Sequence, residues 1–120
     1  MQEMNNKPHI LFVCGQNRWR SPTAARIYAN DQRIEVRSAG VSGKSVHKIS
    51  NQDVEWADIV FVMEQKYKTR LLGTFRGIHL PPIISLDIPD DYKALNGVLV
   101  ELIREGTESN LKHRFGIEAG

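Results

Sequence analysis

The only cysteine of the sequence, Cys14, is followed after five intervening residues by Arg20. Ser21 and Pro22 come next, which is typical of a helix start with serine as the N-cap and proline at the first helical position. A loop at a helix N-terminus binds anions, because successive backbone N–H groups and the helix dipole face the ligand. The same field stabilises a thiolate, and a guanidinium can hold two phosphate oxygens at once. The spacing therefore predicts a phosphate-binding loop with a nucleophilic cysteine.

Two neighbouring side chains could support this chemistry. Ser21 can donate its hydroxyl to the cysteine sulfur as well as cap the helix, and Asn17 can hydrogen-bond across the loop. The competing interpretation is a buried structural cysteine with Arg20 as an ordinary surface charge, since free cysteines are often buried. The apolar segment before Cys14 and the helix start after Arg20 favour the chemical interpretation.

A cysteine that takes up a phosphoryl group also needs an acid to protonate the leaving oxygen and then a base to activate water. The segment from Asp87 to Tyr92 offers three carboxylates, those of Asp87, Asp90 and Asp91. The competing interpretation is helix capping, because acidic residues just before a helix interact favourably with its dipole.

The elements that must position these residues follow from apolar patterning. Strands are predicted at His9 to Val13, Ile34 to Arg37, Ile59 to Met63 and Ile83 to Leu86. The first and third are apolar almost throughout, as in strands that are covered on both faces of a parallel sheet. Helices are predicted from Ser21 to about Asp31, from Ser50 to Ala57, from Glu64 to Leu72 with Gly73 closing it, and from Tyr92 to about Arg104.

Strands that alternate with helices predict an α/β fold of three layers, with a four-stranded, mainly parallel sheet and helices on both faces. In such sheets the functional site lies at the carboxyl ends of the strands. The segments Cys14 to Arg20 and Asp87 to Asp91 both follow predicted strands. We therefore expect them to be neighbours at this edge of the sheet.

Length and composition narrow the class of protein. The chain suits a single domain over residues 1–120, in which residues 106–120 either continue the last helix or pack loosely. A net charge of +2 is too small to predict a nucleic-acid partner. No apolar run approaches the roughly 18 residues of a membrane span, and Met1 to Pro8 has no apolar signal-peptide core. One cysteine fits a reducing compartment, so we expect a cytoplasmic protein that acts without a metal, a cofactor or a membrane.

The segment from Leu11 to Ala24 resembles the signature of the low-molecular-weight protein tyrosine phosphatases, and most closely a short branch of that family. The similarity continues in the family's order at Ser38 to Gly40, at Trp56 to Glu64 and at Ile88 to Tyr92. The family's fold is a four-stranded parallel sheet with helices on both sides, in agreement with the fold that the patterning predicts.

The resemblance implies roles for the residues of the loop. Cys14 would be the nucleophile that forms a phosphocysteine intermediate, and Ser21 would assist the leaving thiolate. Asn17 and Ser38 would support the loop. The phosphate would be held by Arg20 together with the backbone of Gly15, Gln16, Asn17, Arg18 and Trp19.

The resemblance also places the general acid. The family's acid stands in an Asp-Pro-aromatic string, and the match through Ile88 and Pro89 puts it at Asp90. Asp91 then occupies the position where proline is usual, which keeps Asp91 as the alternative acid.

The stretch between Gly40 and Trp56 is shorter than in the longer relatives, where it carries an aromatic wall of the phosphotyrosine pocket. Trp19 and Tyr92 are the candidates to replace that wall on the substrate, and each could equally pack within the protein.

These features predict a cysteine-dependent phosphatase that hydrolyses phosphomonoesters and releases inorganic phosphate. The expected substrates are phosphotyrosine proteins or small aryl phosphates. One alternative is a thiol-dependent arsenate reductase of the same fold, which normally uses further cysteines to resolve its adduct. The other is a non-catalytic phosphate-binding module, which has no use for an acid such as Asp90.

Overall fold

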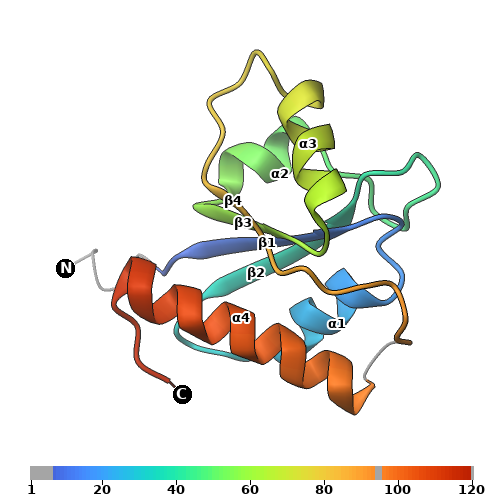
Figure 1. Ribbon diagram of the computed structural model, residues 1–120. Helices are drawn as coiled ribbons and strands as arrows, with labels where there is room; N and C mark the ends of the chain where they lie inside the picture. The colour runs from blue at the N-terminus through green and yellow to red at the C-terminus, as the bar shows by residue number, and fades with distance from the viewer. Residues whose placement is uncertain (1–6, 94–95, 120) are drawn as a thin grey trace.

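The computed structural model describes residues 7–93 and 96–119 of the chain, which form one parallel sheet with helices on both sides (Figure 1). The strand order is β2-β1-β3-β4, and every neighbouring pair is parallel. The strands are β1 (His9–Cys14), β2 (Glu35–Gly40), β3 (Ile59–Val62) and β4 (Ile83–Ser85). The helices are α1 (Arg20–Ile27), α2 (Asn51–Trp56), α3 (Gln65–Thr74) and α4 (Gly97–Phe115). The predicted fold class is confirmed.

Alternation along the central strands divides the core between two layers. Ile10 and Phe12 of β1 face the layer of α1 and α4, whereas Leu11 and Val13 face the layer of α2 and α3 (Figure 1). All four side chains are fully buried. A strand between two helical layers has no solvent face, which explains why β3 and the part of β1 after His9 lack polar residues.

At the ends of the first three helices, one sequence prediction is confirmed and two are wrong. Ser50 does cap α2, through a capping box with Asp53. Ser21, by contrast, is not the N-cap of α1, because α1 begins one residue earlier at Arg20 and the Ser21 hydroxyl is engaged within the loop. Gly73 does not close α3, which continues to Thr74.

The last helix begins later and ends later than the pattern predicted. The segment before it cannot be helical, because Ile88 is buried and pairs by its N–H with the Met63 carbonyl. The α4 helix begins instead after Asn96, whose side chain accepts hydrogen bonds from the N–H groups of Val98 and Leu99. Residues 94 and 95 of the predicted helix, like most of the segment Met1 to Pro8, lie outside the described residues.

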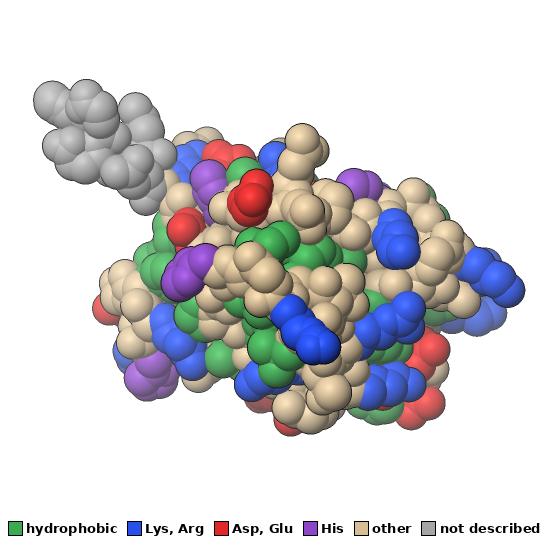
Figure 2. Space-filling model, turned by 90° about the horizontal axis from the view of Figure 1, so that it is seen from above, with side chains coloured by type: hydrophobic (Ala, Val, Ile, Leu, Met, Phe, Trp, Pro, Cys, Tyr) green, Lys and Arg blue, Asp and Glu red, His purple; other side chains and the backbone are tan. Residues whose placement is uncertain are grey.

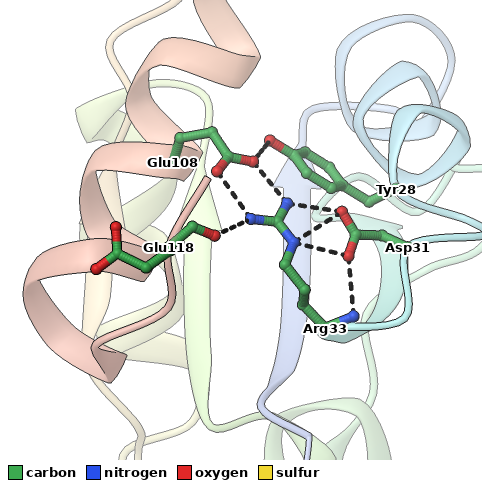
Figure 3. A network of polar contacts seen from close by, with 5 residues as sticks. All are labelled: Tyr28, Asp31, Arg33, Glu108 and Glu118. Atoms are coloured by element: carbon green, nitrogen blue, oxygen red, sulfur yellow. Dashed lines mark hydrogen bonds and ion pairs between the residues drawn. The ribbon is translucent and has the colours of Figure 1, made fainter. Parts of the chain in front are cut away.

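The C-terminal half of α4 packs on the domain and is not loose, since Thr107 and Leu111 are fully buried. A polar network fastens it (Figure 3). Arg33 donates to both carboxylate oxygens of Glu108 at 3.0 and 2.8 Å, to Asp31, and to the Glu118 carbonyl at 2.8 Å. The buried Tyr28 hydroxyl donates to Glu108 as well.

Charge pairing in this network shifts the acidities of its members. Hydrogen bonds from Arg33 hold the pKa of Asp31 and of Glu108 below their ordinary values. Burial and the hydrogen bond to Glu108 raise the pKa of Tyr28. The network therefore links α4 to the α1–β2 connection with both carboxylates in their charged form at neutral pH.

None of the helices within residues 7–93 and 96–119 is both long and apolar enough to cross a bilayer.

Candidate active site

A pocket of about 360 Å³ opens where β1 ends, at the carboxyl edge of the sheet. It is lined by residues of the loop after β1, of the segment after β2, of α3 and of the segment after β4, namely Cys14, Gly15, Gln16, Arg18, Trp19, Arg20, Val41, Ser42, Tyr67, Arg70 and Asp90. The two segments that the topology was expected to bring together do lie side by side. The edge thus gathers a thiol, cations and a carboxylate in one cavity.

The loop from Cys14 to Arg20 is held from outside by residues 41–46, which we call the strap. The Cys14 carbonyl accepts from Val41 N–H at 3.1 Å, the Gly15 carbonyl from Ser42 N–H at 2.9 Å, and the Gln16 carbonyl from Val46 N–H at 3.3 Å. Ser45 Oγ donates to the Gly15 carbonyl too.

This anchoring also orients the loop's donors. In a trans peptide the N–H points opposite to the C=O of the preceding residue. The N–H groups of Gly15, Gln16 and Asn17 therefore point away from the strap, on the pocket side. No acceptor for them is found in the described part of the chain. Three consecutive free N–H groups form the kind of concavity that binds an anion.

Ser21 contacts the Cys14 thiol, and Asn17 contacts Ser21 in turn. Cys14 Sγ lies 2.9 Å from Ser21 Oγ, and Ser21 Oγ also donates to Asn17 Oδ1 at 2.9 Å. All three residues are buried. Asn17 has φ 56°, a left-handed conformation that asparagine tolerates better than most residues. The Ser21 hydroxyl has one proton, so it can donate to a charged sulfur by turning away from Asn17 Oδ1.

Arg20 is almost completely buried and is clamped by three groups. Its Nη1 donates to Glu64 Oε2 at 2.5 Å and to the Ile88 carbonyl at 2.7 Å, and its Nη2 donates to the Tyr67 hydroxyl at 3.2 Å. Burial by itself lowers the pKa of the Arg20 guanidinium, but the hydrogen bonds to Glu64 and Tyr67 outweigh it and raise the pKa. Arg20 therefore stays charged despite its burial.

The clamp leaves one edge of the Arg20 guanidinium for a ligand. Both Nη1 hydrogens are taken, so the edge formed by Nε and Nη2 is the one available for a bidentate contact. Asp90 Oδ1 lies 3.7 Å from Nε at this edge. An oxyanion held by Arg20 would therefore lie next to the Asp90 carboxyl.

The acid candidates differ in position. Asp90 lines the pocket and its side chain is 65% exposed, whereas Asp91 is exposed but does not line the pocket. Tyr92 packs against the hydrophobic core and likewise does not line the pocket. Ser38 lines a separate shallow groove with His47 and Asp53, and the loop contact expected of it is made by Ser45 instead.

Comparison with known proteins bears on the whole arrangement. No protein-family model and no curated protein matches the sequence. Among solved structures, the YwlE arginine phosphatase from Geobacillus stearothermophilus gives a TM-score of 0.61 at 24% identity, over 89% of this chain and 97% of that chain. The low-molecular-weight protein tyrosine phosphatase SP-PTP from Streptococcus pyogenes gives 0.72 at 17% identity, over 89% and 93%. The tyrosine phosphatase Wzb from Escherichia coli K30, in complex with phosphate, gives 0.66 at 18% identity, over 86% and 95%.

The chain has the low-molecular-weight phosphatase fold. The resemblance that begins at Leu11 is thereby confirmed at the level of the fold. At these identities the comparison covers backbone arrangement, and the chemistry of the site has to be argued from this chain's own side chains. The chain spans nearly the full length of each of the three structures.

Among the site residues that were not predicted from the sequence, three belong to the segment after β3. Glu64 and Tyr67 hold Arg20, and Arg70 lines the pocket. The sequence did contain a signal for them. Because β3 was predicted as a buried parallel strand, the residues that follow it are expected at the same edge of the sheet as Cys14. Glu64, Tyr67 and Arg70 are spaced three residues apart, which places them on one side of the helix.

Tyr67 also forms a wall of the pocket. A Cβ added at Gly15 would lie 2.8 Å from the Tyr67 hydroxyl, so the two residues are in close contact. Trp19 is 38% exposed at the rim, with the Arg18 guanidinium 5.6 Å from its ring centroid. Tyr67 and Trp19 therefore supply the aromatic surface of the pocket, and Tyr92 does not.

Nothing within the described residues resembles a metal centre, since no three His, Cys, Asp or Glu side chains come close enough together to hold an ion.

Proposed function

We propose that this protein is a cysteine-dependent phosphatase that hydrolyses phosphomonoesters through a phosphocysteine intermediate. The observation that carries the proposal is the convergence on one pocket of Cys14, the free edge of Arg20 and Asp90. A binding module would need the first two groups only. The Asp90 carboxyl beside the phosphate position supplies the general acid that is needed to protonate a leaving group.

In the first step the Cys14 thiolate attacks phosphorus, so that an S–P bond forms as the P–O bond to the leaving group breaks. Protonated Asp90 gives its proton to the departing oxygen. Arg20 and the loop N–H groups hold the three remaining phosphoryl oxygens, whose charge must be stabilised during transfer.

In the second step a water oxygen attacks the phosphocysteine. The Asp90 carboxylate takes a proton from that water, the S–P bond breaks and inorganic phosphate leaves. The sulfur departs as a thiolate, and the Ser21 hydroxyl 2.9 Å away can donate to it. Both Cys14 and Asp90 are then ready for another cycle.

The walls of the pocket support one substrate class. Tyr67 and Trp19 present aromatic surface suited to an aryl group. A phosphoarginine, the kind of substrate that YwlE's name assigns to that protein, would bring a further guanidinium toward Arg18 and Arg70. We therefore propose phosphotyrosine proteins or small aryl phosphates as substrates, as for the tyrosine phosphatases of this fold.

The test is hydrolysis of para-nitrophenyl phosphate, together with phosphotyrosine and phosphoarginine peptides. We expect Cys14→Ser and Arg20→Ala to abolish turnover, and acid-quenched wild type to carry a phosphoryl group on Cys14. Asp90→Asn should slow aryl-phosphate hydrolysis by about 10²–10⁴-fold, and Asp91→Asn should slow it less. An active Cys14→Ser protein would overturn the mechanism, and a larger loss in Asp91→Asn would make Asp91 the acid.

The same proteins separate the arsenate reductase alternative. Arsenate-dependent oxidation of an added thiol, without phosphatase turnover, would favour it over the hydrolase.

A further inference from the structure

Two arginines line the pocket without an ion-pair partner among the described residues. Arg18 from the loop and Arg70 from α3 are both exposed, and neither forms an ion pair with any residue in the described ranges. The phosphate itself requires Arg20 and the loop N–H groups. Arg18 and Arg70 are thus positive charges beyond those that the phosphoryl group uses.

The balance of charge around the opening is one-sided. Among the described residues, Asp90 is the one carboxylate that lines the pocket, against Arg18, Arg20 and Arg70, of which Arg20 is paired with Glu64. Lys66 lies 5.3 Å from the Tyr67 ring centroid but is paired with Glu64 at 3.8 Å, so Arg18 and Arg70 are the cations that count here. Figure 2 shows Lys and Arg side chains prominent toward the right-hand end of the face seen from above, the end at which the loop lies in Figure 1. A second anionic group on the substrate would be attracted here.

Apolar side chains on the same rim favour a polypeptide over a small anion. Four large apolar side chains are exposed among the described residues, and two of them, Trp19 and Val46, belong to the loop and the strap. Val46 is 81% exposed, and its N–H anchors the loop at Gln16. Exposed apolar groups flanking a charged pocket suit side chains on either side of a phosphorylated residue.

We propose that the site selects phosphotyrosine segments with acidic residues beside the phosphotyrosine, through Arg18 and Arg70. This rests on the phosphatase function proposed above and adds the class of substrate sequence. Each exposed ion pair contributes modestly, so two together should raise kcat/KM about two- to thirtyfold for an acidic over a neutral peptide at low salt. Screening should reduce the preference at about 0.5 M salt.

The experiment uses three phosphotyrosine peptides of equal length, with acidic, neutral or basic flanking residues. The readout is the ratio of kcat/KM between acidic and neutral peptides for wild type, Arg18→Gln, Arg70→Gln and the double variant. Arg76→Gln is the matched control, since it removes the same charge from an exposed position that does not line the pocket. We expect the ratio to fall in each pocket variant, to approach one in the double variant, and to persist in Arg76→Gln.

Three results would overturn the proposal: equal kcat/KM for the acidic and neutral peptides in wild type, a preference that survives in the double variant, or an equal loss in Arg76→Gln. The last result would mean that the overall field, and not the two rim arginines, sets the preference. Affinities of Cys14→Ser for the same three peptides give the ranking without turnover. Failure of wild type to hydrolyse para-nitrophenyl phosphate would refute the phosphatase, whereas turnover without peptide ranking would refute the acidic preference alone.

Discussion

Replacing Arg33 by Met tests whether the network in Figure 3 fastens the C-terminal helix to the domain. Arg33 is the common donor to Asp31 at 2.6 Å and to Glu108 at 2.8 Å. Methionine keeps much of the aliphatic stem and removes every one of these contacts. The change leaves the carboxylates of Asp31 and Glu108 close together without the cation that lies between them.

The size of the effect follows from the exposure of the three side chains. Arg33, Asp31 and Glu108 are 21%, 18% and 27% exposed, so each ion pair is stronger than a surface pair but weaker than a fully buried one. A hydrogen bond to a charged group contributes roughly 1.5–3 kcal/mol when well shielded. Allowing for solvent screening, we expect Arg33→Met to lower the free energy of unfolding by about 2–3 kcal/mol at neutral pH.

The loss should depend on pH in a defined direction. Hydrogen bonds from Arg33 lower the pKa of Asp31 and of Glu108 in the folded protein. Groups whose folded pKa is lowered contribute stability that is complete above their unfolded value, about 4, and disappears as pH falls through the folded value. The difference between wild type and Arg33→Met should therefore be largest at neutral pH and should shrink below about pH 4.

Urea unfolding across this pH range measures both effects. The matched control is Arg26→Met, at an exposed arginine of α1 that forms no ion pair within the described residues. Equal stability of the two variants at neutral pH would refute the reasoning, as would a difference from wild type that grows on acidification.

Three further predictions concern single side chains. Thr107 is fully buried and its hydroxyl has no hydrogen-bond partner in the described part of the chain, so Thr107→Val should raise the free energy of unfolding by about 1 kcal/mol in urea unfolding. Glu64→Ala should lower kcat/KM for para-nitrophenyl phosphate by roughly 10–100-fold through release of Arg20, and Glu64→Gln, which keeps an acceptor, should lose less. A Cβ at Gly40 would lie 2.8 Å from Asn17 N, so Gly40→Ala should destabilise the fold by about 1–3 kcal/mol, measured by thermal or urea unfolding.

The fold was predictable because its strongest signals are local. After His9, the first strand consists of consecutive apolar residues, as does the strand from Ile59, a pattern that a sheet covered on both faces requires. Ser50 and Asp53 form a capping box whose spacing is visible in the sequence.

The start of α4 was not predictable, for a reason that belongs to the site. The helix was predicted to begin at Tyr92, but the chain leading to it is extended, because the Ile88 carbonyl accepts from Arg20 and the Ile88 N–H pairs with Met63. The α4 helix begins only after its N-cap, Asn96. A tertiary demand thus overrides a local preference. Ser21 is a parallel case, since its hydroxyl serves Cys14 and Asn17 and is not available to cap α1.

Within the site, residues that are contiguous in the sequence could be predicted, whereas residues that only the fold brings together could not. The residues from Cys14 to Ser21 form one contiguous segment whose spacing carries its chemistry. Tyr67 and Glu64 are joined to Arg20 only by the fold, at sequence separations of 47 and 44, and their types are unremarkable for a charged helix. Such partners need the strand order β1-β3 before they can be assigned.

The stretch between β2 and α2 holds the loop from Cys14 to Arg20 in place. Its strap accounts for the carbonyls of three consecutive loop residues, Cys14 to Gln16, and Gly40 permits the close approach that this requires. The aromatic surface is supplied from elsewhere, by Tyr67 on α3, whose hydroxyl also accepts from Arg20. Because Tyr67 both holds Arg20 and forms a wall of the pocket, the position of Arg20 and the shape of the pocket depend on the same residue. Tyr67→Phe should therefore lower kcat/KM for aryl phosphates, because Arg20 loses its hydrogen bond to the hydroxyl although the aromatic ring remains.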